Sequence, residues 1–168
     1  MSSQKPGCLA GLFGWGRSQR PQEQFPFKAR PFFLSKAEPS FYHALKHLTG
    51  TNIVIFPHVA VRDLVTATGV DKADYYRFFN QIDRKQVDFL LAESKTLKPV
   101  LVIELDDSTH QRVDRVQRDR FVENVLAAAR IPLARVPVQQ SYDTKELVEL
   151  FRRTIQMNQA QASIQKDK

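Results

Sequence analysis

The sequence predicts one α/β domain built on a mixed four-stranded sheet. Two observations carry this prediction. Three apolar segments of strand length follow an opening helix, and a later helix separates the third segment from a fourth. Consecutive strands joined by short turns pair as an antiparallel meander, whereas a strand, helix, strand unit implies a parallel crossover. The expected order is therefore helix, three strands, helix, strand and a final helix.

The helices are expected from the spacing of their apolar residues. In "SKAEPSFYHALKHLTG", residues 35–50, Phe41, Leu45 and Leu48 are spaced by four and three positions and would share one face. Gly50 is a suitable residue to close this helix. Two more helices are expected, over residues 112–130 and 143–156.

The strands are expected from short runs rich in Val, Ile and Leu. They are "NIVIFPHVAV", "QVDFLL", "VLVIELD" and "IPLARVPV", at residues 52–61, 86–91, 100–106 and 131–138. Between the first two strands, residues 62–84 are polar and irregular, and "ADYYRFF" within them can form a short helix.

Composition bounds the partners and the compartment. The 168 residues carry a formal net charge of +7, which favours a polyanionic partner, nucleic acid first and an anionic membrane surface second. The single cysteine excludes an intrachain disulfide and suits a reducing, cytoplasmic compartment, and no run is long enough to span a bilayer. We expect a flexible basic leader over residues 1–30, the domain over 31–156, and a polar tail over 157–168.

Acidic residues gather on two of the expected strands. Residues two apart in a strand share a face, so Glu104 and Asp106 would point the same way. If their strand pairs with the one before it, Asp88 can meet Glu104 across the ladder. Several buried carboxylates together need a cation or shared protons, and oxygen ligands suit Mg²⁺ or Mn²⁺. We therefore expect Asp88, Glu104 and Asp106 to form a metal site.

Other polar residues near these acids have two explanations each. Glu38 belongs to the apolar side of the first helix and can serve the metal site, yet Ser35-x-x-Glu38 also has the spacing of a capping box. His110 can act as a general acid or base, or it can be a turn residue bonded to nearby carboxylates. The following helix carries basic residues that either face solvent or contact phosphates: Arg112, Arg115 and Arg118.

Together these motifs resemble a known protein family. "LSKAEPSFYHAL", "QVDFLL", "VLVIELDDSTHQ", "RDRFVENVLAAARIPLARV" and "YDTKEL" resemble the bacterial domain-of-unknown-function family numbered 2726, over about residues 33–151. That family is grouped with the restriction-endonuclease-like PD-(D/E)XK superfamily and is similar to the very short patch repair endonucleases. The resemblance implies a restriction-endonuclease-like three-layer sandwich, with a core of helix, three strands, helix and strand, and an extra C-terminal helix.

The resemblance also implies metal-dependent hydrolysis of phosphodiester bonds in nucleic acid, with DNA as the first candidate. By position, Glu38 corresponds to the acid of the first helix, Asp88 to the metal-binding Asp of the second strand, and Glu104 to the acid of the third. These three residues, Asp106 and His110 are the expected catalytic residues.

One departure from the superfamily pattern keeps other functions open. Asp106 stands where the superfamily usually has a lysine, so another polar residue, His110, Gln86 or an arginine, would have to take over the role of that lysine. The missing lysine favours a catalytically inactive module that binds nucleic acid or a protein partner. A metal-independent hydrolase with a carboxylate pair, as in glycosidases, is a further alternative.

Overall fold

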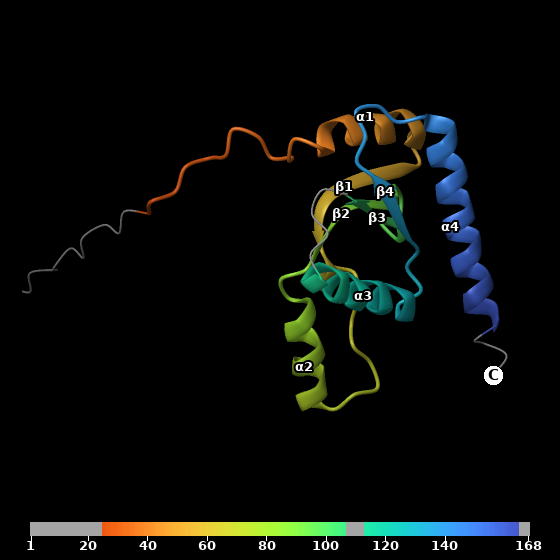
Figure 1. Ribbon diagram of the computed structural model, residues 1–168. Coiled ribbons are helices and arrows are strands. Elements are labelled where there is room, and N and C mark those ends of the chain that lie inside the picture. Colours follow the sequence, from red (N-terminus) through yellow and green to blue (C-terminus); the bar gives the residue numbers. More distant parts are fainter. Residues whose placement is uncertain (1–24, 107–112, 165–168) are drawn as a thin grey trace, which may run out of the picture. The chain divides into compact units, whose positions relative to one another are not determined.

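The computed structural model describes the backbone of residues 25–106 and 113–164, and the side chains of the same ranges except 113–119 and 164 (Figure 1). The chain divides into two compact units, residues 1–31 and residues 32–168. In the described part of the first unit, Phe25 and Phe27 are exposed. The leader expected over residues 1–30 otherwise lies outside the described residues.

The second unit contains all the helices and strands of the described residues. In chain order they are α1 (Glu38–Thr49), β1 (Ile53–Ala60), the short 3-10 helix η1 (Val61–Asp63), α2 (Lys72–Ile82), β2 (Gln86–Glu93), β3 (Pro99–Asp106), α3 (Val113–Ala128), β4 (Leu133–Pro137) and α4 (Thr144–Ile164). Within the described part of the chain, no helix has the length and apolar character needed to cross a bilayer.

The four strands form one mixed sheet in the order β1-β2-β3-β4, which confirms the predicted sheet. β1, β2 and β3 pair antiparallel; a short turn joins β2 to β3, whereas η1 and α2 lie in the long connection from β1 to β2. β4 lies parallel to β3 because α3 carries the chain back. The register places Phe89 opposite Ile103 between β2 and β3.

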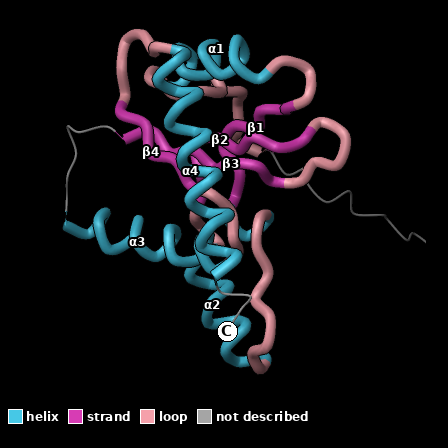
Figure 2. The backbone as a smooth tube through the Cα atoms, turned by 90° about the vertical axis from the view of Figure 1, so that its right-hand side faces the viewer, coloured by secondary structure: helices cyan, strands magenta, loops and turns pink. Residues whose placement is uncertain are grey.

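Helices cover both faces of the sheet (Figures 1 and 2). On one face, Phe41 of α1 and Phe151 of α4 pack in a buried cluster with Phe89 of β2. On the other face, Leu126 of α3 packs in a second buried cluster with Val102 of β3. The two clusters are the α1/α4 core and the α3 core.

Two helices differ in extent from the sequence prediction. The segment 62–84 contains a full helix, α2, because the Asp71 side chain caps it by accepting a hydrogen bond from Asp74 N–H at 2.8 Å. α4 continues to Ile164 instead of ending near residue 156. Its last turns are rich in Gln, Ala and Met, which have high helix propensity although they show no apolar stripe.

β1 and β2 both change face at the same point of the sheet. Residues two apart in a strand normally share a face, but Val87 packs in the α3 core whereas Phe89 packs in the α1/α4 core. On the neighbouring strand β1, His58 has a left-handed backbone conformation with φ +54°. Pro57 and Val59 pair with β2, and His58 between them does not. Asp88 lies at this irregularity, between the two faces.

Candidate functional site

The acidic residues meet where the ladder between β2 and β3 ends. After the Phe89–Ile103 pair, the next positions on the two strands are Asp88 and Glu104. The regular pairing is replaced there by a side-chain contact, because Leu105 N–H donates to Asp88 Oδ2 at 2.7 Å. We call Glu38, Asp88, Glu104 and Asp106 the acid cluster.

The carboxyl group of Asp88 lies in a poorly solvated and negatively charged environment. Burial raises its pKa above the ordinary range, and this is the largest effect. The hydrogen bond from Leu105 N–H and the nearby His58 oppose the increase, whereas the charges of Glu38 and Asp106 add to it. Electrostatic interactions therefore link Asp88 to residues of α1, β1 and β3.

Glu38 contacts both the segment before α1 and strand β1. Its side chain is buried, and Oε2 accepts a hydrogen bond from Ser35 N–H at 2.8 Å. The N-cap of α1 is Ala37 and Glu38 is its first residue, so this bond lies before the helix and is not a capping box. The same oxygen lies 2.9 Å from His58 Nε2, so an ionised Glu38 accepts a hydrogen bond from Nε2–H. One carboxylate oxygen of Glu38 therefore contacts both Ser35 and His58.

His58 is a site residue that sequence reasoning missed. A positive φ is uncommon outside glycine, and such a conformation costs about 1–3 kcal/mol, so the surrounding contacts must hold it. Those contacts are the bond to Glu38 and the ring of Phe33, whose centroid lies 4.9 Å from that of His58. The only sequence signal was a polar Pro57–His58 step within an otherwise apolar strand.

Arg135 is the second residue that was missed. Its guanidinium NH1 lies 3.1 Å from Glu104 Oε2 and 3.0 Å from Asp106 Oδ1, and its Nε donates to Glu123 Oε1 at 2.9 Å. Burial acts to lower the pKa of Arg135, but the bond to Glu123 and the charges of Glu104 and Asp106 outweigh it and raise the pKa. Arg135 is therefore a permanent cation beside the acid cluster.

A protein-family model matches most of the chain. The model described as "Protein of unknown function (DUF2726)" matches residues 30–155, three quarters of the chain. The chain belongs to the DUF2726 family. No curated protein and no solved structure matches the chain. The whole sheet, the acid cluster, His58 and Arg135 lie within the DUF2726 region.

The remaining predicted site residues of this DUF2726 protein cannot be placed. His110 and Arg112 lie outside the described residues. Arg115 and Arg118 belong to α3, but their side chains fall in the part of the helix for which side chains are not described. The prediction that these arginines contact phosphates therefore stays a prediction.

The donor set of the DUF2726 acid cluster suits a hard divalent cation in kind. Asp88, Glu104 and Asp106 supply only carboxylate oxygens, and the guanidinium of Arg135 offsets the charges of Glu104 and Asp106. Within the described ranges, however, no three His, Cys, Asp or Glu side chains form a group arranged to hold a metal ion. The carboxylate oxygens are ligands of the kind that Mg²⁺ or Mn²⁺ prefers. In this structure, contacts with Arg135 and with Leu105 N–H hold these side chains.

Proposed function

We propose that this protein is a metal-dependent nuclease with a restriction-endonuclease-like fold, which hydrolyses phosphodiester bonds in nucleic acid. The observation that carries the proposal is the position of Asp88 and Glu104. They are the next residues on β2 and β3 after Phe89 and Ile103, the last pair of the β2–β3 ladder. When α2, which lies between β1 and β2, is set aside, the order of helix, three strands, helix and strand also agrees with the core of the PD-(D/E)XK superfamily.

In this proposal Asp88, Glu104 and Asp106 would hold Mg²⁺ or Mn²⁺. When bound, such an ion polarises a phosphate oxygen and lowers the pKa of a bound water. The desolvated carboxyl group of Asp88 supports this role, because a buried carboxylate is stabilised by a cation.

Glu38 and His58 would act as a pair in the hydrolysis. Glu38 would orient the attacking water and accept its proton, as expected for a carboxylate within reach of the acid cluster. His58 holds Glu38 in place through the 2.9 Å contact between Nε2 and Oε2, and thereby sets the direction of the carboxylate. The left-handed backbone at His58 brings its ring to this position.

Arg135 would supply the charge of the superfamily lysine. Asp106 occupies the position of that lysine, and the Arg135 guanidinium lies 3.0 Å from Asp106 and 3.1 Å from Glu104. A cation there stabilises the negative charge that develops on the phosphate in the transition state. An arginine from β4 would thus replace a lysine from β3.

The test is an incubation of the full chain with plasmid DNA, single-stranded DNA and RNA in the presence of Mg²⁺ or Mn²⁺. We expect cleavage of at least one substrate, its loss on chelation, and its loss in Glu104→Gln. Glu149→Gln is the matched control, because Glu149 is an exposed glutamate of α4 with only surface ion pairs. Absence of cleavage for all three substrates would contradict the proposal.

One observation favours a second candidate, an inactive nuclease-fold module that binds nucleic acid or a protein partner. Arg135 already bonds to Glu104 and Asp106, and so occupies the carboxylates that a metal ion would need. In that case the full chain would cleave no substrate and would bind nucleic acid equally well with and without chelator, and Glu104→Gln would leave the binding unchanged.

A further inference from the structure

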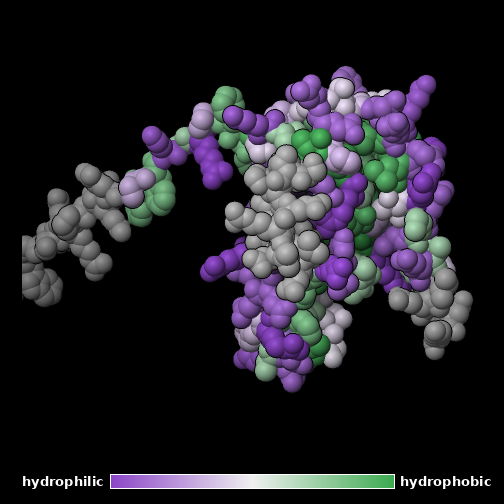
Figure 3. All heavy atoms as spheres, in the orientation of Figure 1, coloured by the Kyte–Doolittle hydropathy of each residue, from purple (hydrophilic) through white to green (hydrophobic). Residues whose placement is uncertain are grey.

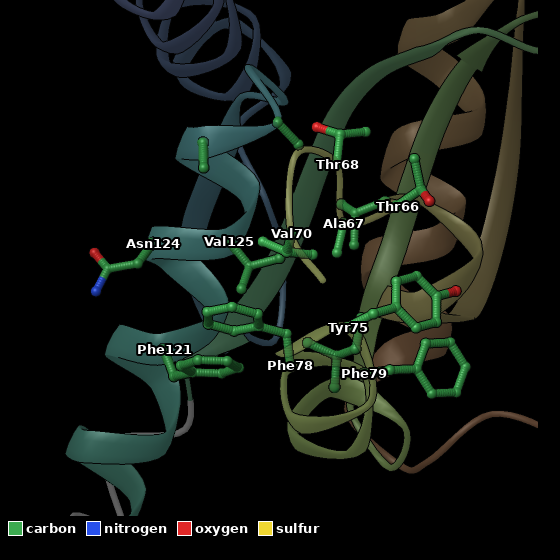
Figure 4. A pocket seen from close by; sticks show the side chains of 14 residues that line it. Thr66, Ala67, Thr68, Val70, Tyr75, Phe78, Phe79, Phe121, Asn124 and Val125 are labelled. Carbon is green, nitrogen blue, oxygen red and sulfur yellow. The ribbon is translucent and has the colours of Figure 1, made fainter. Parts of the chain in front are cut away.

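An aromatic pocket of about 510 Å³ lies between α2, the loop of residues 65–70 and the second half of α3 (Figure 4). This volume falls in the range of roughly 300–1,000 Å³ that is usual for small-ligand sites. The pocket is separate from the acid cluster, because no residue of that cluster is part of its lining.

Aromatic rings form much of the pocket wall. Tyr75 and Phe79 of α2 are stacked, with ring centroids 5.9 Å apart and an angle of 15° between the planes. Phe78 of α2 and Phe121 of α3 point into the space between the two helices (Figure 4). Phe78 is 36% exposed, so a ligand can reach its ring. Flat walls of this kind suit a planar ring that can stack.

Polar groups at the pocket complement its apolar walls. Thr66 and Thr68 of the loop are part of the lining, and their hydroxyl groups can donate and accept hydrogen bonds. Asn124 of α3 also belongs to the lining, and Figure 4 shows its amide directed away from α2. Figure 3 shows hydrophobic and hydrophilic residues side by side at the α2 end of the domain. This combination is typical of sites that bind a flat molecule with polar edges.

Each of the two helices has an arginine next to residues of the pocket wall, although neither arginine is part of the lining and Arg77 is paired with Asp74. The Arg77 guanidinium carbon lies 4.4 Å from the centroid of the Phe78 ring, and Arg77 also donates to Asp74 at 3.0 Å. On α3, the exposed Arg120 precedes Asn124 by one turn and lies on the same side of the helix. A ligand with a phosphate next to its planar ring would match these cations.

α3 connects the aromatic pocket to the acid cluster. Phe121 and Asn124 line the pocket, whereas Glu123 is bonded to Arg135 and through it to Glu104. With a rise of about 1.5 Å per residue, these side chains belong to one turn of the helix. One turn of α3 thus contributes to the pocket wall and, through Glu123 and Arg135, contacts the acid cluster.

From these observations we infer that the aromatic pocket binds one unpaired nucleobase of a nucleic-acid strand whose backbone reaches the acid cluster. Stacking on aromatic side chains and contact with arginine is the usual way in which proteins hold unpaired bases. The choice of a nucleobase over another planar ligand rests on the proposed function. The substrate class is then single-stranded nucleic acid or a duplex with an unpaired base.

The test measures binding separately from cleavage. Two fluorescein-labelled DNA strands of equal length, one with bases and one abasic, are titrated with the full chain in chelator, and fluorescence anisotropy gives Kd for each. We expect the base-bearing strand to bind more tightly. Phe78→Ala should weaken its binding by roughly 5- to 150-fold and leave the abasic strand unaffected. Tyr76→Ala is the matched control, because Tyr76 is 53% exposed on α2 and lies outside the pocket wall.

A second variant guards against loss of folding. Phe121→Leu removes the ring but keeps an apolar side chain, and circular dichroism checks that both variants are folded. The inference is overturned if the wild-type chain binds both strands equally, or if Phe78→Ala and Tyr76→Ala have the same effect. An apolar peptide is titrated in parallel. The inference is also overturned if Phe78→Ala and Phe121→Leu weaken the binding of this peptide but not the binding of the base-bearing strand.

The outcomes of this test and of the cleavage test are independent. Glu104→Gln should keep the preference for the base-bearing strand even though it abolishes cleavage. A wild-type chain that prefers the base-bearing strand but cleaves nothing would leave the pocket inference standing and contradict the nuclease proposal. Cleavage without any such preference would do the reverse.

Discussion

His58 Nε2 and Glu38 Oε2 lie 2.9 Å apart, although the two residues are 20 positions apart in the chain. Glu38 starts α1 and His58 lies in β1, so this contact ties the first helix to the edge strand of the sheet. Glu38 is buried, and a buried carboxylate needs such a donor. The contact therefore has consequences for stability that can be measured.

The first prediction concerns the coupling between these two residues. A double-mutant cycle with Glu38→Ala and His58→Asn should give a coupling free energy of unfolding of about 1–3 kcal/mol, because the bond involves a charged and buried group. The same cycle on Glu149 and Arg152, an exposed pair 3.2 Å apart, should give less than about 0.5 kcal/mol. Urea unfolding measures both, and equal values would contradict the prediction.

The second prediction concerns the backbone of His58. His58→Gly and His58→Ala both remove the ring, but only glycine adopts a positive φ without strain. We expect the glycine variant to be more stable than the alanine variant by about 1 kcal/mol.

Phe56 provides the control for that comparison, because it lies in β1 without a positive φ. There the alanine variant should be the more stable of the two, by about 0.5–1 kcal/mol, since glycine weakens a regular strand. Thermal unfolding of the four variants measures these differences. If the alanine variant is the more stable one at both positions, the backbone of His58 is not strained.

The third prediction concerns Asp88 and pH. The folded state raises the pKa of its carboxyl group, so between the ordinary Asp pKa of about 3.9 and the folded value the folded protein binds more protons than the unfolded chain. The contribution of Asp88 to stability is therefore fully present below the ordinary pKa and is lost as pH rises through the folded pKa.

Asp88→Asn removes this ionisation and keeps an oxygen that can accept the bond from Leu105 N–H. We expect the variant to be more stable than the wild-type chain at pH 7, and the difference to vanish in acid. Urea unfolding as a function of pH, with chelator present to exclude metal binding, measures the difference. A variant that is less stable at pH 7 would show that another interaction of the carboxylate dominates.

The fourth prediction concerns Arg135. Arg135→Met leaves Glu104, Asp106 and Glu123 without their shared cation, and it should lower the free energy of unfolding at pH 7 by about 1–3 kcal/mol. Arg152→Met, which alters an exposed arginine of α4, should change it by less than about 0.5 kcal/mol. In acid the loss in Arg135→Met should shrink, because protonated carboxyl groups no longer need the cation. An equal loss at both pH values would contradict this account.

The sequence predicts the sheet well because local patterns determine it. The apolar run around Ile103 and the short turn before it predict the β2–β3 hairpin, and the alternation along β3 predicts that Glu104 and Asp106 share a side. The helix between β3 and β4 predicts their parallel pairing. These features depend on residues that are close in the sequence, so one chain is enough to infer them.

The missed residues depend on contacts between distant segments. Arg135 reaches Glu104 only because β4 returns parallel to β3 in one particular register, which residue spacing does not specify. His58 reaches Glu38 only through a positive φ, which no pattern of apolar residues indicates. For the same reason residue spacing does not predict the aromatic pocket, since α2 and α3 form it together.

The change of face at His58 and Asp88 has a structural consequence for both cores. Up to Ile55, β1 directs its odd-numbered apolar residues toward α1 and α4, but beyond His58 it directs Val59 toward α3, and Val87 of β2 does the same. If β1 were straightened at His58, Val59 would point toward α1 and α4, and Val87, which pairs with it, would have to follow. The α3 core would then be underfilled. The change of face beside the charged residues therefore decides on which side of the sheet Val59 and Val87 pack, so the interior and the polar end of the sheet have to evolve together.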